Sequence, residues 1–222
     1  RTLVSVWRGL MKQEDTKRKI LEKALELFAE KGYDSVSVGE IANAVGIKAP
    51  SLYNHYNSKQ AIFDAIFANA AEKYEKYTDT VSVHVQNAAQ DLDVFTKITE
   101  DMLADKVTKI FAYSLHDKTI SRFRRMMTIE QFRSAELSEL YSKRYIYRLT
   151  EYHSALFKGL IKAGKIKNED PETLALMYVS PIITLIEVCD RQPEKEAECI
   201  EKLKAHVRLF YRTFHISGGG EK

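Results

Sequence analysis

The sequence between residues 37 and 59 reads SVGEIANAVGIKAPSLYNHYNSK, and it predicts two short helices joined by a tight turn. Ser37 and Glu40 have the S-x-x-E spacing of a capping box, in which each side chain pairs with a free backbone N–H at a helix start. Gly46 follows the last apolar residue of this helix, where glycine readily adopts the left-handed conformation that ends many helices. Pro50 suits the first turn of a second helix because its φ is already fixed and it has no N–H to lose.

Two helices with a short turn between them are typical of the helix-turn-helix, whose second helix enters the major groove of DNA. Leu52 and Tyr56 form an apolar pair on one face of the second helix, whereas Lys48, Ser51 and His55 fall on the other face. The same spacing also fits a helical hairpin that only packs against its neighbours. The residues alone therefore leave a DNA-binding and a purely structural interpretation open.

This stretch resembles the DNA-binding domain of the TetR family of bacterial transcription regulators. The resemblance rests on Ile41-Ala42, on the Val45-Gly46-Ile47 turn, on the run from Pro50 to Lys59, and on the preceding run from Leu27 to Tyr33. It covers about residues 16 to 67 and agrees in residue type, order and spacing. The resemblance favours DNA binding over a hairpin that only packs.

The resemblance also implies which residues contact DNA. Phosphate contacts fix the register of a protein on DNA without reading its sequence. The residues implied to make them are Ser37, Tyr53, His55 and Lys59. The N-terminal end of the recognition helix faces the base edges. The residues there are Lys48, Ala49, Pro50 and Ser51. Lys48 could pair with guanine, whereas Ala49 and Pro50 could touch thymine methyl groups.

Charge supports this interface only locally. The chain has 34 basic and 31 acidic side chains and a formal net charge of +3, so no large basic field surrounds it. However, the stretch from Ile41 to Lys59 contains no acid, and Lys17, Arg18 and Lys19 cluster ahead of the first apolar helix face. Contact with phosphates therefore depends on where the basic residues lie, not on bulk charge.

The sequence predicts an all-α protein with two domains. Residues 12–60 are expected to form an N-terminal three-helix domain with a DNA-binding helix-turn-helix, and its first helix starts near Thr16. Residues 61–216 are expected to form a C-terminal helical bundle for effector binding and dimerisation. Residues 1–11 match nothing in the helical pattern and are interpreted as an extension or a disordered arm, and residues 217–222 as a loose tail.

Apolar residues at helical spacing predict a connector helix after Ser58 and then a bundle of about five helices. The helices of the bundle are expected over residues 92–116, 118–133, 136–163, 171–189 and 193–214. Val81, Val83 and Val85 alternate as in a strand, but no partner strand is evident, so a linker or a helix start is favoured.

The sequence contains no arrangement of residues typical of an enzyme. Its histidines form no H-x-x-x-H pair, and neither a G-x-S-x-G motif nor a glycine-rich phosphate loop occurs, so no cofactor or metal is expected. Cys189 and Cys199 lack metal-binding spacing and are expected to be plain buried thiols in a reducing compartment. No apolar run near the roughly 18 to 20 residues of a membrane span is evident, which predicts a cytoplasmic protein without a membrane partner.

The second domain is rich in aromatic and methionine side chains. In a helical bundle such residues either fill the core or line an apolar ligand site, and the residues alone do not decide between these roles. The resemblance implies that some of them line a pocket for a small-molecule effector. The candidates are Met102, Tyr113, Met127, Phe132, Tyr145, Tyr152 and Tyr178.

The resemblance finally implies a function. The chain is expected to act as a repressor that dimerises through its last two helices and binds a palindromic double-stranded DNA operator. A small-molecule effector would release it by binding the DNA-incompatible arrangement of the dimer more tightly than the compatible one. The alternative is a helical ligand-binding or adaptor protein with a vestigial helix-turn-helix.

Overall fold

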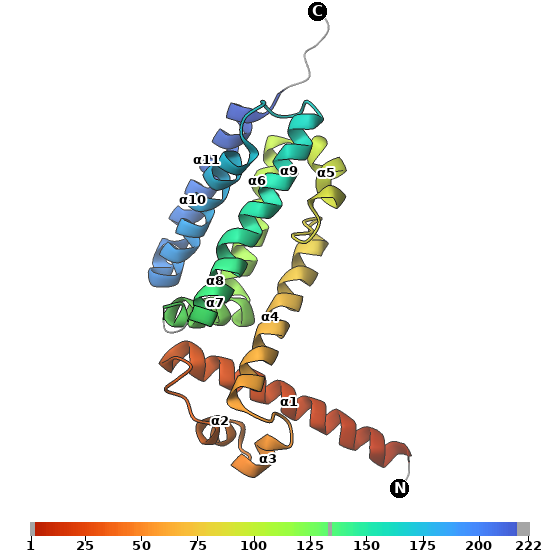
Figure 1. The fold of residues 1–222 in the computed structure, drawn as a ribbon, viewed down its shortest axis with the longest axis vertical. Coiled ribbons are helices and arrows are strands. Elements are labelled where there is room, and N and C mark those ends of the chain that lie inside the picture. Colours follow the sequence, from red (N-terminus) through yellow and green to blue (C-terminus); the bar gives the residue numbers. More distant parts are fainter. Residues whose placement is uncertain (1–2, 133–134, 217–222) are drawn as a thin grey trace, which may run out of the picture. The chain divides into compact units, whose positions relative to one another are not determined.

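The computed structural model describes residues 3–132 and 135–216, and helices account for its regular structure apart from one isolated bridge between Ile166 and His215 (Figure 1). The helices are α1 (Leu3–Lys31), α2 (Val38–Val45), α3 (Ala49–Tyr53), α4 (Lys59–Thr80), α5 (Ala88–Thr96), α6 (Glu100–His116), α7 (Lys118–Glu130), α8 (Ala135–Tyr141), a π-helical turn (Ser142–Tyr147), α9 (Arg148–Lys162), α10 (Pro171–Arg191), a 3-10 turn (Pro193–Lys195) and α11 (Glu196–Phe214). The predicted all-α class is confirmed. The predicted tail lies outside the described residues.

The chain divides into two compact units that are not continuous in sequence. The first unit comprises residues 1–73 and 118–138, and the second comprises residues 74–117 and 139–222. Helix α7 therefore belongs to the first unit, where it packs against α1. A functional boundary near residue 60 stays a prediction.

The first unit has an apolar interior. Its fully buried apolar side chains come from α1, α2, α3, α4 and α7: Ile20, Phe28, Ile41, Leu52, Ile62, Phe63, Ile66, Phe123, Met126 and Met127. Helix α1 begins at Leu3 and not near Thr16, so the expectation that residues 3–10 lie outside the helical pattern was wrong. This segment contains no proline, and extending a formed helix costs far less than starting one.

The second unit is a bundle in which α6, α9, α10 and α11 share one core. A single helix was expected over residues 92–116, but the chain breaks it into α5 and α6. At the break Thr99 caps α6, because its side chain accepts a hydrogen bond from the N–H of Met102 at 3.3 Å. The apolar spacing continues across this cap, so periodicity alone did not reveal it.

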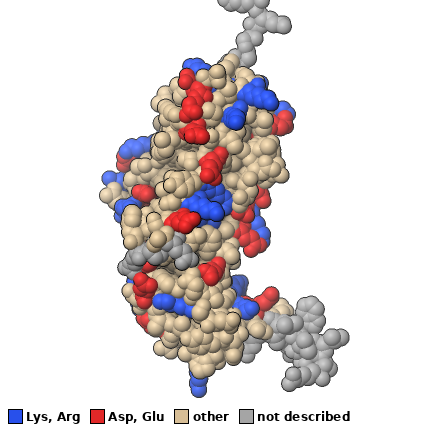
Figure 2. All heavy atoms as spheres, viewed as in Figure 1, with Lys and Arg blue, Asp and Glu red and all other residues tan. Residues whose placement is uncertain are grey.

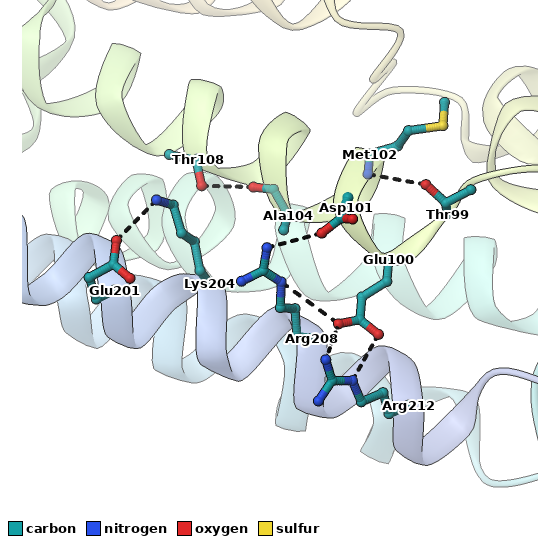
Figure 3. Close-up of polar contacts among 10 residues, drawn as sticks. All are labelled: Thr99, Glu100, Asp101, Met102, Ala104, Thr108, Glu201, Lys204, Arg208 and Arg212. Carbon is teal, nitrogen blue, oxygen red and sulfur yellow. Dashed lines mark hydrogen bonds and ion pairs between the residues drawn. The ribbon is translucent and has the colours of Figure 1, made fainter.

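Charged side chains tie the start of α6 to α11 (Figure 3). Glu100 accepts two hydrogen bonds from the Arg212 guanidinium, at 2.8 Å from Nε and 2.6 Å from Nη2. Asp101 accepts one from Arg208 at 3.0 Å. The Arg212 guanidinium lowers the pKa of Glu100 below its ordinary value. These paired contacts set the spacing of two helices that form walls of the bundle interior.

Helix α10 corrects one expectation about membranes. Within residues 3–132 and 135–216 it is the one helix that is long and apolar enough to cross a membrane, judged by length and composition. The expectation that the chain contains no apolar run of this length was therefore wrong. Core helices of soluble proteins pass the same test. Here α10 packs against α9 and α11 and buries Leu174, Tyr178 and Val179 (Figure 1).

Candidate DNA-binding surface and ligand cavity

The predicted capping box at the start of α2 is confirmed. Ser37 Oγ accepts from the N–H of Glu40 at 3.1 Å, and a Glu40 carboxylate oxygen accepts from the N–H of Ser37 at 2.8 Å. The bond from the Ser37 N–H, together with the ammonium of Lys31, lowers the pKa of Glu40 to about 2. The Ser37 hydroxyl, which the resemblance assigned to a phosphate contact, is thus already engaged at the helix start.

The turn between α2 and α3 also follows its sequence signals. Gly46 has φ of 79°, in the left-handed region, and the N–H of Ile47 bonds to the carbonyl of Ala42 at 3.0 Å. Pro50 lies in the first turn of α3, and Leu52 is fully buried against the core of the first unit. The local sequence therefore fixes both the end of α2 and the direction of α3.

The outer face of α3 is open to solvent. Lys48, Pro50 and Ser51 are exposed and Tyr53 is 49 % exposed, whereas Ala49 and His55 are half-buried. No partner of the Lys48 ammonium is found within the described chain. On the face drawn in Figure 2, the region of α2 and α3 consists mainly of uncharged side chains with isolated basic ones. Four residues that the resemblance assigned to DNA contact, Lys48, Pro50, Ser51 and Tyr53, are therefore accessible to a partner molecule.

Lys59 has partners within the protein. Its ammonium donates to the carbonyl oxygens of Tyr33, Asp34 and Val36 at 2.9, 3.4 and 3.0 Å, and it lies 4.3 Å from the centroid of the Tyr33 ring. An ammonium has three protons, so these carbonyls use its full donor capacity. The structure thus places Lys59 as a clamp that joins the start of α4 to the loop between α1 and α2.

Tyr33 and Glu130 are part of the same arrangement, and sequence reasoning did not single them out as functional. The N–H of Tyr33 donates to the Glu130 carboxylate at 2.8 Å, and the Tyr33 ring packs between Phe28 and Phe63. Glu130 is fully buried at the end of α7. The loop before α2 is therefore held from both α4 and α7. No sequence pattern reveals this pairing, because its partners lie 97 residues apart.

The second unit contains a cavity of about 140 Å³. Its walls come from α4, α5, α6, α9, α10 and α11 and from the loops that follow α4 and α9. Most lining side chains are apolar. The polar, aromatic-polar and charged ones are Tyr74, Lys106, Ser114, Tyr152, His153, Lys165, Tyr178, Tyr211 and His215. A concave, mainly apolar space with few polar groups is the usual form of a small-molecule site.

The structure brings two of the seven candidate ligand residues together at this cavity. Tyr152 and Tyr178 line it. The other five lie elsewhere: Met127 in the core of the first unit, Phe132 88 % exposed, Met102 55 % exposed on α6 (Figure 3), Tyr113 stacked on Tyr77, and Tyr145 in the π-helical turn. The lining residues that sequence reasoning missed include Lys106 and His153, which no motif marks.

A buried carboxylate organises one end of the cavity. Asp91 is fully buried and accepts from the N–H of His84 at 2.7 Å, from the His84 ring and from the Tyr152 hydroxyl. The nearby Lys106 ammonium donates to a backbone carbonyl and is stabilised by the charge of Asp91, although burial lowers its pKa. The negative and positive charges at this end therefore offset each other within the protein.

His153 is held as a neutral ring at the centre of the cavity wall. Its Nδ1 lies 2.7 Å from the carbonyl of Leu149, which requires the proton to be on Nδ1, so Nε2 is an acceptor. The ring packs against those of Tyr152, Phe157 and Tyr178. Burial lowers the pKa of His153 to about 4.

This lowered pKa predicts a pH-dependent loss of stability. A histidine in the unfolded chain binds a proton near its ordinary pKa, whereas folded His153 resists it, so the stability is complete above that pKa and falls as the pH drops toward the folded value. Between about pH 7 and about pH 4.5 the free energy of unfolding should fall by about 2 kcal/mol more in the wild type than in His153→Phe. Urea unfolding at both pH values measures this difference, and parallel pH profiles would contradict it.

Within the described parts of the chain no group of three His, Cys, Asp or Glu side chains is placed to hold a metal ion. Cys189 and Cys199 are free and buried, as the sequence predicted.

The chain is similar in sequence to known transcription regulators. Residues 20–66 match the family described as bacterial regulatory proteins, tetR family. A probable HTH-type transcriptional regulator, YttP of Bacillus subtilis (strain 168), is 25 % identical over 203 residues, which is 90 % of this chain and 88 % of that protein. IcaR of Staphylococcus aureus (strain Newman), a negative transcriptional regulator of a biofilm operon, is 48 % identical over 48 residues, but these are only 22 % of this chain and 26 % of IcaR.

Solved structures share the fold over nearly the whole chain. A TetR transcriptional regulator from Chloroflexus aurantiacus superposes with a TM-score of 0.70 at 21 % identity, covering 93 % of this chain and 100 % of that one. The complex of SmeT with triclosan gives a TM-score of 0.67 at 15 % identity, covering 92 % and 93 %. SmeT is the repressor of a multidrug efflux pump of Stenotrophomonas maltophilia.

Residues 20–66, which hold the helix-turn-helix, therefore match the DNA-binding part of TetR-family transcription regulators. Over nearly its whole length the chain is similar to members of that family in sequence and in fold.

Proposed function

We propose that this protein is a homodimeric repressor that binds a palindromic operator with its two α3 helices and leaves it when a small molecule enters the cavity of the second unit. The single observation that carries the proposal is the exposed, acid-free face of α3 with Lys48 and Tyr53 at its surface. Relatives with repressor function, IcaR and SmeT, support the direction of regulation. The proposal includes a cytoplasmic location, which the match to a family of bacterial transcription regulators supports.

The last two helices support the proposed dimer. Leu176 and Met177 on α10 are 58 % and 50 % exposed, and Leu209 on α11 is 66 % exposed. The two helices pack side by side within the second unit (Figure 1). Exposed apolar side chains that gather on neighbouring helices commonly mark a protein interface. A two-fold dimer would present two recognition helices to successive major grooves.

The cavity supports the proposed effector site, with Tyr152 and Tyr178 in its wall. Helix α4 connects this site to the DNA-binding surface, because Tyr74 lines the cavity and Lys59 opens the same helix. An effector changes DNA affinity only if it binds one arrangement of the dimer more tightly than the other. We therefore assign α4 as the element through which occupancy of the cavity reaches the recognition helices.

Substitutions on α3 test the DNA-binding proposal. Lys48→Ala should weaken operator binding by about tenfold, since a good base or phosphate contact contributes about 1–3 kcal/mol. Tyr53→Phe removes only a hydroxyl and should weaken binding severalfold for all sequences alike. Fluorescence anisotropy with operator DNA measures both, and Lys97→Ala, an exposed lysine of the second unit, is the control. Affinities equal to wild type for both α3 variants would refute this assignment of the surface.

A further inference from the structure

Most polar groups in the cavity wall already have partners inside the protein. The Tyr152 hydroxyl donates to Asp91, and the hydroxyls of Ser114 and Tyr211 donate to backbone carbonyls at 2.8 and 3.2 Å. A ligand that bonded to any of these would have to break an existing bond. Such groups therefore contribute little to ligand selection.

The side chains of His153 and Tyr178 differ from these, because each has a polar atom that is not engaged within the described protein. His153 Nε2 is an acceptor, since Nδ1 carries the proton that Leu149 O accepts, and Tyr178 has a hydroxyl that can donate. Within residues 3–132 and 135–216 neither His153 Nε2 nor the Tyr178 hydroxyl has a hydrogen-bond partner. Their rings are neighbours, with centroids 5.0 Å apart. Neither atom is among the buried side-chain atoms without a partner in the described chain, and both residues line the cavity, so a ligand there can reach both groups. A ligand that pairs with both gains hydrogen bonds that a purely apolar ligand lacks.

The pair of groups defines the chemistry of its partner. A hydroxyl can donate to Nε2 and accept from the tyrosine at the same time, because it is both donor and acceptor. A carboxylate has no proton to give to Nε2, so two acceptors would face each other. An ammonium ion can donate but cannot accept, and it would lose its hydration among the rings of Phe157 and Tyr178.

We propose that His153 and Tyr178 bind the hydroxyl group of an uncharged, mainly apolar ligand built on a single ring, which donates to His153 Nε2 and accepts from the Tyr178 hydroxyl. The cavity of about 140 Å³ is of the size that holds a benzene ring in an apolar protein interior. The inference rests on the proposed effector function and specifies the effector class, a phenol or a ring-bearing alcohol.

Two lysines at the cavity provide the strongest counter-hypothesis. The charge of Lys106 is offset by Asp91. Lys165 lies near His215, whose pKa is lowered by burial and, to a smaller extent, by the charge of Lys165. A ligand with a negative charge could place its head group there. A carboxylate probe is therefore the critical comparison for the proposed class.

The test uses the full chain and four probes with one scaffold: para-ethylphenol, ethylbenzene, para-ethylbenzoate and para-ethylbenzylammonium. Binding is measured by calorimetry. We expect para-ethylphenol to bind about tenfold more tightly than ethylbenzene, because it satisfies both free groups. The two charged probes should bind more weakly than ethylbenzene.

Three variants assign the effect to the pair. Tyr178→Phe removes one oxygen and keeps the ring, and His153→Phe removes the acceptor and keeps an aromatic ring. Each should abolish most of the preference for para-ethylphenol over ethylbenzene. Tyr211→Phe is the matched control: its hydroxyl is already bonded, so this change should alter the affinities for both probes by the same factor.

Three outcomes would overturn the proposed ligand class. Equal affinity for the phenol and ethylbenzene, or an undiminished preference in both Tyr178→Phe and His153→Phe, would show that the pair does not bind a hydroxyl. Tighter binding of para-ethylbenzoate, lost in Lys165→Met, would show an anion site. Binding of operator DNA is measured separately. A phenol that binds but leaves DNA affinity unchanged would refute the effector function and keep the ligand class. Release of the protein from DNA by the carboxylate probe would keep the effector function and refute the ligand class.

Discussion

Leu209→Glu is expected to turn the proposed dimer into a monomer and to lower operator affinity by at least about a hundredfold. Leu209 is 66 % exposed on α11, so a charge there costs little in the folded monomer. In a two-fold interface the same position would bury one carboxylate from each copy without a partner, which costs several kcal/mol. A monomer then holds only one half-site, and the gain from two linked contacts is lost.

Sedimentation velocity measures the oligomeric state of this variant, and anisotropy measures its operator affinity. Leu176→Glu should behave in the same way, because Leu176 is exposed on α10. Ile146→Glu is the matched control, since Ile146 is also exposed but lies in the π-helical turn outside the last two helices. A Leu209→Glu protein that stays dimeric and binds the operator like wild type would refute the proposed interface.

Lys59→Met is expected to destabilise the first unit by about 2 kcal/mol in the absence of DNA, because three carbonyls lose a charged donor. The loss is smaller than the sum of three charged hydrogen bonds, because Lys59 is half-buried and water replaces part of the lost contacts. The loss of the contact with the Tyr33 ring acts in the same direction. Thermal unfolding followed by circular dichroism measures the change.

The same variant separates two roles for Lys59. A lysine that only contacts phosphate would leave stability intact and reduce the slope of log affinity against log salt by about 1. If Lys59 holds the loop between α1 and α2, its loss lowers the stability of the first unit and weakens operator binding because the loop is displaced. Lys48→Met is the control, because Lys48 is exposed and caps no backbone group of α3. Unchanged stability in Lys59→Met would restore the phosphate role that the family resemblance implied.

The DNA-binding surface was predictable because its signals are local. The capping box of Ser37 and Glu40, the left-handed Gly46 and the opening Pro50 each act within a few residues, so the sequence already indicated α2, the turn and α3. The role of Lys59 was not predictable in this way. Its three partners lie 23 to 26 residues earlier in the chain, and only the fold brings them to its ammonium.

The elements that differed from expectation share one cause. Periodicity reports which residues are apolar, but not where a helix is interrupted. The cap at Thr99 divides one apolar pattern into α5 and α6, and α1 extends to Leu3 although its apolar stripe begins later. Local hydrogen bonding and helix extension decided these boundaries.

The composition of the cavity wall could not be deduced from residue types. Aromatic and methionine residues occur throughout the chain, and only packing decides which of them face a common space. Thus Tyr152 and Tyr178 line the cavity, whereas Met127 fills the core of the first unit. His153 was passed over because a single histidine carries no motif, although its ring lines the cavity.

The most direct test of the account measures how the wild-type protein binds the promoter DNA of its own gene over a series of salt concentrations. We predict that one dimer binds a palindromic site and that log affinity falls linearly with log salt, with a slope of about −0.9 for each phosphate contact. Binding that is independent of salt, or no preference for a palindromic site over random DNA, would contradict a sequence-specific regulator and favour a ligand-binding or adaptor protein with a vestigial helix-turn-helix.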